Sequence, residues 1–294
     1  MTDRRRLVRV PASSANLGPG YDVLAAAVSL HLELEVAEAG EFSVVAEDDQ
    51  VPRDRANLCV RAFEALHPAD GLRFVIRSEI PLARGLGSSA AAIVAGLMAA
   101  DHLYELGLER DEVYERAVDL EGHPDNVGAA LYGGFVLCPQ ALDGARPRPV
   151  RLDPPQGVEG VLVVPEDEVP TERAREAMPA NVPVDDAVAN VAAASQLVLG
   201  VERSDLTLIE RGLADRLHQP HRAHLYPRSM DLLAEARGIG AIGATVSGAG
   251  PALLFWCFWQ DTGKVTEALR ERVAGWAEVL RSPFSPLGAD VPEL

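Results

Sequence analysis

The sequence predicts an α+β fold organised in two domains. Apolar and polar residues alternate over residues 32–36 and 72–76, and this period of two is typical of strands that bury one face. Residues 88–106 are rich in alanine and contain no proline, which predicts a long and largely buried helix. Because the predicted strands and helices do not alternate regularly along the chain, an α+β arrangement is favoured over a doubly wound sheet.

The domain organisation follows from the length of the chain and from one change in composition. A chain of 294 residues, 48% hydrophobic and 24% charged, can bury one large core or two modest ones. Proline, glycine, aspartate and arginine crowd together over residues 141–157, as expected of an exposed connection. We therefore predict a first domain over residues 1–150 and a second domain over residues 151–294.

The remaining elements are predicted from local patterns. Residues 57–66 indicate a helix with Asn57 as its candidate N-cap, and residues 111–120 indicate another, which Gly122 and Pro124 are expected to break. A returning strand is predicted over residues 134–138. Further strands are predicted over residues 158–164, 242–246 and 252–257, with a turn at 247–251, and further helices over 171–177, 184–199, 206–217, 229–236 and 262–274.

The charge of the chain narrows the classes of partner. A net charge of −17 at pH 7 and a pI near 4.8 disfavour nucleic acid and anionic membranes, because both would repel the surface. Lys264 is the only lysine, so an anionic ligand would be met by arginine, whose guanidinium offers paired donors to carboxylate or phosphate.

The cysteines and the first residues predict a cytoplasmic protein. Cys59, Cys138 and Cys257 are widely spaced and lack the pairing of a zinc site, so we expect buried free thiols. Residues 1–10 turn into a strand pattern with no apolar stretch behind them, which argues against a signal peptide. No run of residues approaches the length that spans a membrane.

A glycine- and serine-rich loop at residues 80–91 runs from a predicted strand into the long helix. A helix N-terminus presents free N–H groups, glycine lets the backbone approach an oxyanion, and serine hydroxyls add donors or metal ligands. The loop lacks the Gly-Lys-Ser/Thr ending of a Walker motif. Gly85 to Ala90 fits the loose dinucleotide pattern G-x-G-x-x-A, but Asp101 lies within a helix, where a dinucleotide site would need an acid ending a strand. The loop alone fits an anion site and a glycine turn that merely starts a packed helix equally well.

Sequence blocks elsewhere in the chain extend this interpretation. Residues 11–22, PASSANLGPGYD, resemble the first signature of homoserine kinases, and residues 81–91 resemble the second signature shared by galactokinases, homoserine kinases, mevalonate kinases and phosphomevalonate kinases, the GHMP kinases. Residues 247–251, SGAGP, resemble the third signature. Residues 121–127, EGHPDNV, are similar to homoserine kinases in particular. The blocks occur in the expected order and span most of the chain.

The resemblance implies a two-domain GHMP kinase fold, with a ribosomal-protein-like N-terminal domain and a ferredoxin-like C-terminal domain. The implied activity is ATP-dependent phosphorylation of the side-chain hydroxyl of L-homoserine to O-phospho-L-homoserine, in threonine biosynthesis, with Mg²⁺ and as a homodimer. The alternatives are another GHMP kinase of mevalonate type and a catalytically silent member that binds a ligand.

The resemblance also implies a nucleotide site. Ser89 and Glu121 are expected to hold Mg²⁺, which prefers oxygen ligands, although Ser89 could instead bond backbone groups of the first helical turn and Glu121 could be a solvated helix end. Asn57 is expected on the adenine side or only as a cap, and Gly248 and Gly250 either approach the phosphate loop or only turn a hairpin. The residues expected around the phosphates are Pro81, Leu82, Ala83, Arg84, Gly85, Leu86, Gly87, Ser88, Ser89, Ala90 and Ala91.

By the same resemblance, the amino-acid substrate is surrounded by Asn16, Asp22, His123, Asn126, Arg175 and Arg222. Asp22 suits the ammonium group, and the two arginines suit the carboxylate. Asn126 stands where mevalonate kinases carry an aspartate, and an amide cannot act as a general base. We therefore expect direct in-line transfer, in which the enzyme aligns the hydroxyl with the γ-phosphorus and neutralises charge.

Overall fold

The computed structural model describes residues 4–140 and 147–292, and these form two sheets. The first sheet has the order β3-β4-β2-β5-β6, with β1 also paired to β2, and only β3 and β4 run parallel. The second sheet is antiparallel in the order β10-β7-β9-β8. The strands are β1 (Arg5–Ala15), β2 (Leu24–Glu38), β3 (Ser43–Ala46), β4 (Leu72–Ser78), β5 (Phe135–Leu137), β6 (Val150–Leu152), β7 (Val158–Pro165), β8 (Gly243–Val246), β9 (Leu253–Phe258) and β10 (Ala277–Arg281).

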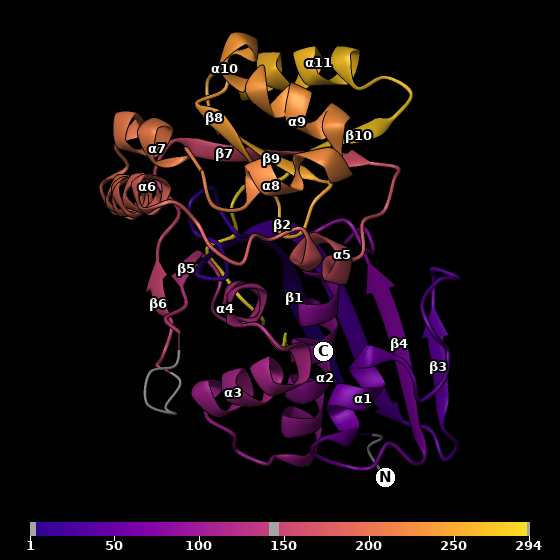
Figure 1. Cartoon of the computed structure of the whole chain (residues 1–294). Helices are drawn as coiled ribbons and strands as arrows, with labels where there is room; N and C mark the ends of the chain where they lie inside the picture. The colour runs from indigo at the N-terminus through magenta and orange to yellow at the C-terminus, as the bar shows by residue number, and fades with distance from the viewer. Residues whose placement is uncertain (1–3, 141–146, 293–294) are drawn as a thin grey trace.

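Helices cover each sheet, as Figure 1 shows, with α1 to α4 beside the first sheet and α9 to α11 above the second. The helices of the first group are α1 (Leu58–Glu64), α2 (Ser88–Tyr104), α3 (Arg110–Glu121) and α4 (Pro124–Tyr132). The later helices are α5 (Thr171–Glu176), α6 (Val184–Arg203), α7 (Leu206–Gly212), α8 (Gln219–Arg222), the 3₁₀ turn η1 (Ala223–Leu225), α9 (Pro227–Ala234), α10 (Ala236–Ile239) and α11 (Thr262–Arg272).

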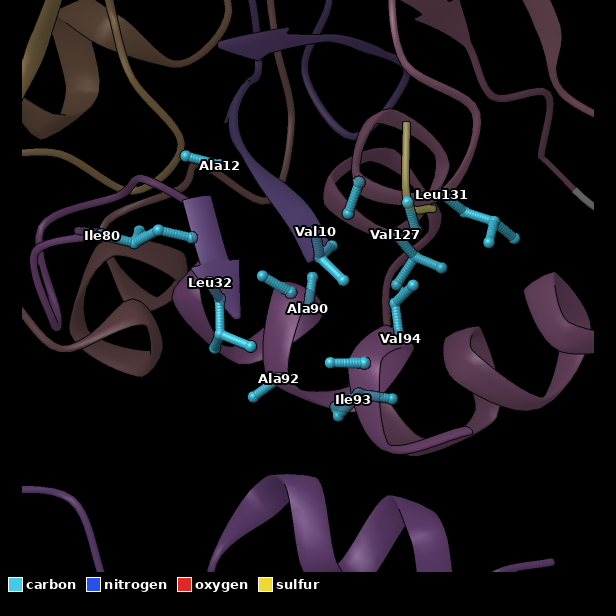
Figure 2. Packing of buried hydrophobic residues seen from close by; sticks show 14 of the residues in the cluster. Val10, Ala12, Leu32, Ile80, Ala90, Ala92, Ile93, Val94, Val127 and Leu131 are labelled. Carbon is cyan, nitrogen blue, oxygen red and sulfur yellow. The ribbon is translucent and has the colours of Figure 1, made fainter. Parts of the chain in front are cut away.

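Helix α2 is the centre of the first core, as its composition predicts. Its alanines let β1, β2 and the neighbouring helices approach closely, and Figure 2 shows Ala90 beside Val10 and Val94 beside Val127. Full burial of an aliphatic side chain such as Val94 contributes about 1.5–3 kcal/mol. The three cysteines are free and buried, as expected. The dense packing fixes the direction of α2 and therefore the place where its N-terminus ends.

Several sequence-based expectations of the elements were wrong. The helix predicted over residues 111–120 ends before Gly122 and Pro124 as expected, but Pro124 also begins α4, which was not predicted; a proline at the first helical position loses no hydrogen bond. The helix predicted over residues 206–217 ends at Gly212, and the backbone of Leu197 in α6 approaches this residue too closely for a Cβ. The strand expected near the N-terminus runs to Ala15, and β3, β6 and β10 were not predicted.

The predicted connection at residues 141–157 is only partly described, because residues 141–146 lie outside the described chain. Within it, β6 pairs with β5 and so belongs to the first sheet. The C-terminal segment returns to that sheet as well, through bridges from Asp290 to Arg9 and from Phe284 to Val28. The division at residue 150 stays a prediction.

Helix α6 differs from the expectation that no segment reaches membrane-spanning length. By length and composition alone, this helix of 20 residues is long and apolar enough to cross a membrane. One face is covered within the chain, where Asn190, Ala193, Leu197 and Val201 are buried, and α6 packs against α7.

Candidate active site

A cavity of about 280 Å³ lies where the predicted motifs meet. It is bounded by the turn after β1, the loop before α2, the junction between α3 and α4, the beginning of α5 and the loop after β8. Its lining residues are Asn16, Asp22, Ala83, Gly85, Leu86, Gly87, Ser88, Ser89, Glu121, His123, Asp125, Asn126, Val169, Thr171, Arg175, Arg222, Gly248 and Ala249.

The N-terminus of α2 opens into this cavity without a side-chain cap. Gly87 is the capping residue, with a left-handed φ of 69°, and among the described residues the helix has no side-chain cap. A Cβ at Gly87 would overlap Ser13 Oγ, and a Cβ at Gly85 would overlap the carbonyl oxygen of Ser247. The loop therefore needs glycine to pack against Ser13 and Ser247, and N–H groups at a helix N-terminus of this kind can bind an anion.

Hydrogen bonds from β1 and from the segment after β8 hold the loop in place. The backbone N–H of Ser13 donates to the carbonyl oxygen of Leu86 at 3.1 Å, and Ser247 Oγ donates to that of Gly85 at 2.7 Å. Arg84 points away from the cavity and donates to the carbonyl oxygens of Pro165 and Glu166, both at 2.8 Å. Arg84 thus ties the loop to the end of β7.

The cavity includes only part of the predicted nucleotide residues. Asn57 caps α1, where its Oδ1 accepts from the N–H of Cys59 at 2.9 Å and its Nδ2 donates to the carbonyl oxygen of Pro52 at 2.8 Å. Gly250 lies against the ring of Tyr226. The predicted residues that do not line the cavity are Asn57, Pro81, Leu82, Arg84, Ala90, Ala91 and Gly250.

Ser89 and Glu121 meet at the mouth of the loop. Ser89 Oγ donates to Glu121 Oε1 at 2.5 Å, a short distance typical of a hydrogen bond to a carboxylate. The Glu121 side chain is 8% exposed, which excludes a solvated helix end, and burial raises its pKa. Two oxygen atoms that could hold a hard cation therefore lie together beside the N-terminus of α2.

The junction between α3 and α4 brings a second ionisable pair to the cavity. His123 Nδ1 lies 3.2 Å from Asp125 Oδ1, and His123 Nε2 lies 3.4 Å from Glu121 Oε1. Burial lowers the pKa of His123, but the hydrogen bond and charge of Asp125 outweigh it and raise the pKa overall. Asp125 is 1% exposed and was missed by the sequence reasoning, although its place between His123 and Asn126 in the fourth block was a signal.

Asn126 has a fixed orientation. Its Oδ1 accepts a hydrogen bond from Ser13 Oγ at 2.8 Å, and its backbone N–H donates to Asp125 Oδ1 at 2.8 Å. Asn126 lines the cavity. Because its Oδ1 already accepts from Ser13, its Nδ2 is the amide atom that can donate to a ligand there. Ser13 was not among the predicted site residues.

Asp22 and Arg175 were expected to hold opposite ends of a zwitterion, and in this structure they pair with each other. Both terminal nitrogens of Arg175 lie 3.2 Å from the two carboxylate oxygens of Asp22. Asn16 supports this turn: its Oδ1 accepts from the N–H of Asp22 at 2.7 Å, and its Nδ2 donates to the carbonyl oxygen of Gly248 at 2.9 Å. Asn16 and Asp22 have left-handed φ values of 57° and 54°, a strain typical of functional sites.

Arg222 is the buried cation of the cavity. It is 1% exposed, and its donors bond the carbonyl oxygens of Ala174 at 3.0 Å and Gly248 at 3.2 Å. The ring of Tyr21 lies 5.1 Å from the guanidinium carbon. No carboxylate forms an ion pair with Arg222 within residues 4–140 and 147–292. A buried charge without a counter-ion is costly, and this arrangement suits an anionic ligand.

Comparison with known proteins agrees with this geometry. Residues 57–134 match the model of the GHMP kinases N terminal domain, and residues 197–276 match that of the GHMP kinases C terminal domain. A homoserine kinase of Thermus thermophilus is 44% identical over 249 residues, which cover 83% of this chain and 84% of the relative. This chain belongs to the homoserine kinase family of GHMP kinases. Another homoserine kinase, from Moorella thermoacetica, is 39% identical over 85% of this chain and 87% of its own.

Solved structures in the homoserine kinase family have the same fold. The homoserine kinase of Cytophaga hutchinsonii superposes with a TM-score of 0.87 at 29% identity, covering 99% of this chain and 98% of its own. A putative homoserine kinase of Listeria monocytogenes gives a TM-score of 0.82 at 32% identity, covering 98% of this chain and 99% of its own. The predicted α+β, two-domain GHMP kinase fold is confirmed.

Proposed function

We propose that this chain transfers the γ-phosphoryl group of ATP to the side-chain hydroxyl of L-homoserine, giving O-phospho-L-homoserine for threonine biosynthesis. The observation that carries the proposal is the cavity itself. It joins an uncapped, glycine-lined helix N-terminus to Asp22 and to the uncompensated cation of Arg222. An anion site beside groups suited to a zwitterion fits a kinase whose substrate is an amino acid.

The phosphates of ATP would bind at the free N–H groups of Gly87, Ser88 and Ser89, on the cavity side of the loop. Both amide atoms of Asn57 are engaged by backbone, so its contribution would be to hold the start of α1 in place. Gly85 and Gly248 would let the third signature close over the loop, because their backbones already lie in contact.

Mg²⁺ would be held by Ser89 and Glu121. A hydroxyl and a carboxylate whose oxygens lie 2.5 Å apart fit a hard, oxygen-seeking cation. When bound, the cation supplies neutralisation of phosphate charge. Burial disfavours the ionised form of Glu121, and a neighbouring cation would offset that cost.

The chain's own residues would align the reacting groups and supply no dedicated base. Asn126 has an amide held by Ser13, so it can donate a hydrogen bond to the substrate hydroxyl but cannot take its proton. On binding, the ammonium group of homoserine would form an ion pair with Asp22, and its carboxylate would form ion pairs with Arg175 and Arg222. The substrate would therefore open the Asp22–Arg175 pair and replace it with two pairs of its own.

A substrate panel tests the proposed function. Purified protein with ATP and Mg²⁺ is offered L-homoserine, mevalonate, L-serine and L-threonine in turn, and ADP release is followed. The proposal predicts release that depends on L-homoserine and is much slower with the other compounds. Release with mevalonate would favour a mevalonate-type kinase, and no release with any compound would favour a silent ligand-binding member.

We further propose that two copies associate through α6. Its outward face is uncharged over most of its length, with Val184, Val188 and Val191 at 77%, 62% and 68% exposure. Asp185 and Arg203 lie exposed at opposite ends of the helix. In an antiparallel pair of α6 helices, Asp185 of each copy would face Arg203 of the other, whereas a parallel pair would oppose like charges. Glu202 would lie beside the other helix's N-terminus, where negative charge is favoured.

Light scattering after size exclusion tests this association. Asp185→Arg and Arg203→Asp should each weaken the dimer, and the double variant should restore it. Val188→Asp should give a monomer, while Val45→Asp, at an exposed position on β3, should leave the dimer intact. A monomeric wild type, or one that binds anionic vesicles through α6, would contradict the proposal.

We propose the cytoplasm as the place of action, without a nucleic-acid or membrane partner. The free buried thiols and the charge of −17 support this. Fractionation of the source cells tests it: activity in a membrane or extracellular fraction would contradict it.

A further inference from the structure

Arg222 must point in one direction to serve as a ligand for the substrate carboxylate. Its guanidinium is buried, and backbone carbonyls of Ala174 and Gly248 hold part of it. These carbonyls accept hydrogen bonds but carry no full negative charge, so the cation stays available to an anion in the cavity. The remaining hydrogen-bond partner of Arg222 is a histidine that the mechanism above does not use.

His218 is wholly buried, with 0% exposure, immediately before α8. Its Nε2 lies 2.8 Å from the carbonyl oxygen of Gly18 and 3.1 Å from that of Asn16. Carbonyl oxygens only accept, so Nε2 carries the proton. The other nitrogen, Nδ1, lies 3.3 Å from Nη1 of Arg222, which only donates. One neutral tautomer therefore satisfies every contact of the ring.

Burial favours the neutral ring, although Asp215 Oδ2 lies 3.6 Å from Nε2. Burial lowers the pKa of His218; Asp215 acts in the opposite direction and the charge of Arg222 in the same direction. The Asp215 carboxylate is already engaged by the backbone N–H groups of Leu217 and Gln219, each at 2.7 Å. The remaining neighbour is the ring of Tyr21, 5.5 Å away between centroids.

We infer that His218 is a positioning residue for substrate binding. Its Nε2–H fixes the imidazole on the first-signature turn, and its Nδ1 holds Nη1 of Arg222, so that the rest of the guanidinium faces the substrate carboxylate. The inference rests on the proposed function. Through His218, the turn that carries Asn16 and Asp22 is joined to the buried guanidinium of Arg222. Binding of both ends of the zwitterion would then depend on one histidine.

Asparagine and glutamine separate the two nitrogens of His218. An asparagine amide ends near the position of Nδ1, so His218→Asn keeps an acceptor for Arg222 and loses the bonds to Gly18 and Asn16. A glutamine amide reaches the position of Nε2, so His218→Gln keeps donors for the two carbonyls and removes the acceptor for Arg222. A positioning role and a merely structural role therefore predict opposite rankings of the two variants.

The readout compares L-homoserine with 3-aminopropan-1-ol, which is homoserine without its carboxylate. The ratio of kcat/KM for these two compounds measures how well the enzyme uses the carboxylate. His218→Gln should raise KM for L-homoserine and lower this ratio by about tenfold, with kcat and KM for ATP retained, since it loses a hydrogen bond to a charged group. His218→Asn should keep the ratio while its thermal midpoint falls. His224→Gln, at an exposed neighbouring site, is the control and should change neither.

The outcomes separate the inference from the proposed function. If the wild-type protein does not phosphorylate L-homoserine, the proposed function is wrong. A wild type that uses L-homoserine, combined with an unchanged ratio in His218→Gln or an equal loss in both variants, would overturn the positioning role alone. If His218→Gln does not fold, retention of the ratio in His218→Asn supports the role and its loss contradicts it.

Discussion

Arg175 and Asp22 form a two-pronged ion pair across the mouth of the cavity, with both nitrogen-to-oxygen distances at 3.2 Å. The pair joins the turn after β1 to α5, segments 153 residues apart in the chain. In the free protein each residue neutralises the other. Burial lowers the pKa of Arg175, but the charge and hydrogen bonds of Asp22 outweigh it and raise the pKa overall. The two side chains proposed to bind the substrate therefore compensate each other's charge in the free protein.

Replacing Asp22 should affect binding more than stability. Asp22→Ala should raise KM for L-homoserine about tenfold or more, because it removes a charged hydrogen-bond partner of the ammonium group, while KM for ATP is retained. The side chains of Arg175 and Asp22 are 41% and 25% exposed, so unfolding by urea should change by no more than about 1 kcal/mol. Glu35→Ala, which breaks the exposed pair with Arg5, is the control. Unchanged homoserine kinetics in Asp22→Ala would refute the assignment.

Replacing Gly87 should damage the nucleotide site beyond the cost of its backbone angle. Gly87→Ala and Gly107→Ala both put a side chain at a left-handed φ, 69° and 71°, which costs about 1–2 kcal/mol. A Cβ at Gly107 meets nothing within 4 Å, whereas one at Gly87 overlaps Ser13 Oγ. Gly87→Ala should therefore lose about 1–3 kcal/mol more in chemical denaturation and raise KM for ATP. Equal behaviour of the two variants would contradict the packed loop.

Two adjacent serines offer a matched test of the Asn126 orientation. Ser13 Oγ bonds Asn126 Oδ1, while Ser14 Oγ is buried without a hydrogen-bond partner among the described residues. Ser13→Ala should lower kcat about tenfold to a hundredfold, because a misaligned amide no longer places the attacking hydroxyl. Ser14→Ala should leave kcat unchanged. Steady-state kinetics decide the matter, and a similar kcat in both variants would count against alignment by Asn126.

Glu121 should link activity to stability and pH. Burial raises its pKa above the ordinary value of 4.5, so the folded state holds the proton more tightly than the unfolded state. The stability that this group contributes is therefore present at low pH and is lost as pH rises from about 4.5 through the raised pKa. Glu121→Gln should remove this loss and make the free protein more stable at neutral pH, at a cost in kcat.

Denaturation curves of wild type and Glu121→Gln across pH, with and without Mg²⁺, measure this link. Mg²⁺ should stabilise the wild type more than the variant, because it offsets the charge of the ionised carboxylate. An identical pH dependence for the two proteins would refute the buried ionisable role of Glu121.

Local patterns were enough to predict most elements and the glycine-rich loop that enters α2. The alanine-rich run became α2, and the glycines before it became the uncapped entry to the helix. The end of α3 before Pro124 was predicted, but the helix that Pro124 begins was missed, because a proline can follow one helix and also occupy the first position of the next. The short strands β3 and β6 have four and three residues, too few to establish a period.

The tertiary pairings of the site could not be predicted from the sequence. The pairs Ser13–Asn126 and Ser89–Glu121 join residues 113 and 32 positions apart, and a motif match names such residues without saying which atoms meet. The contact of His218 with Asn16 spans 202 positions. These contacts depend on how the two sheets bring distant turns together, which no local spacing encodes.

The identity of the phosphorylated product is the most direct test of the proposed homoserine kinase activity. Phosphorus NMR of a reaction of the purified protein with ATP, Mg²⁺ and L-homoserine should show a new phosphate monoester on the homoserine side chain, formed in equal amount to ADP. ADP accompanied only by free phosphate would contradict this activity. So would a monoester that forms in a parallel reaction with mevalonate but not in the reaction with homoserine.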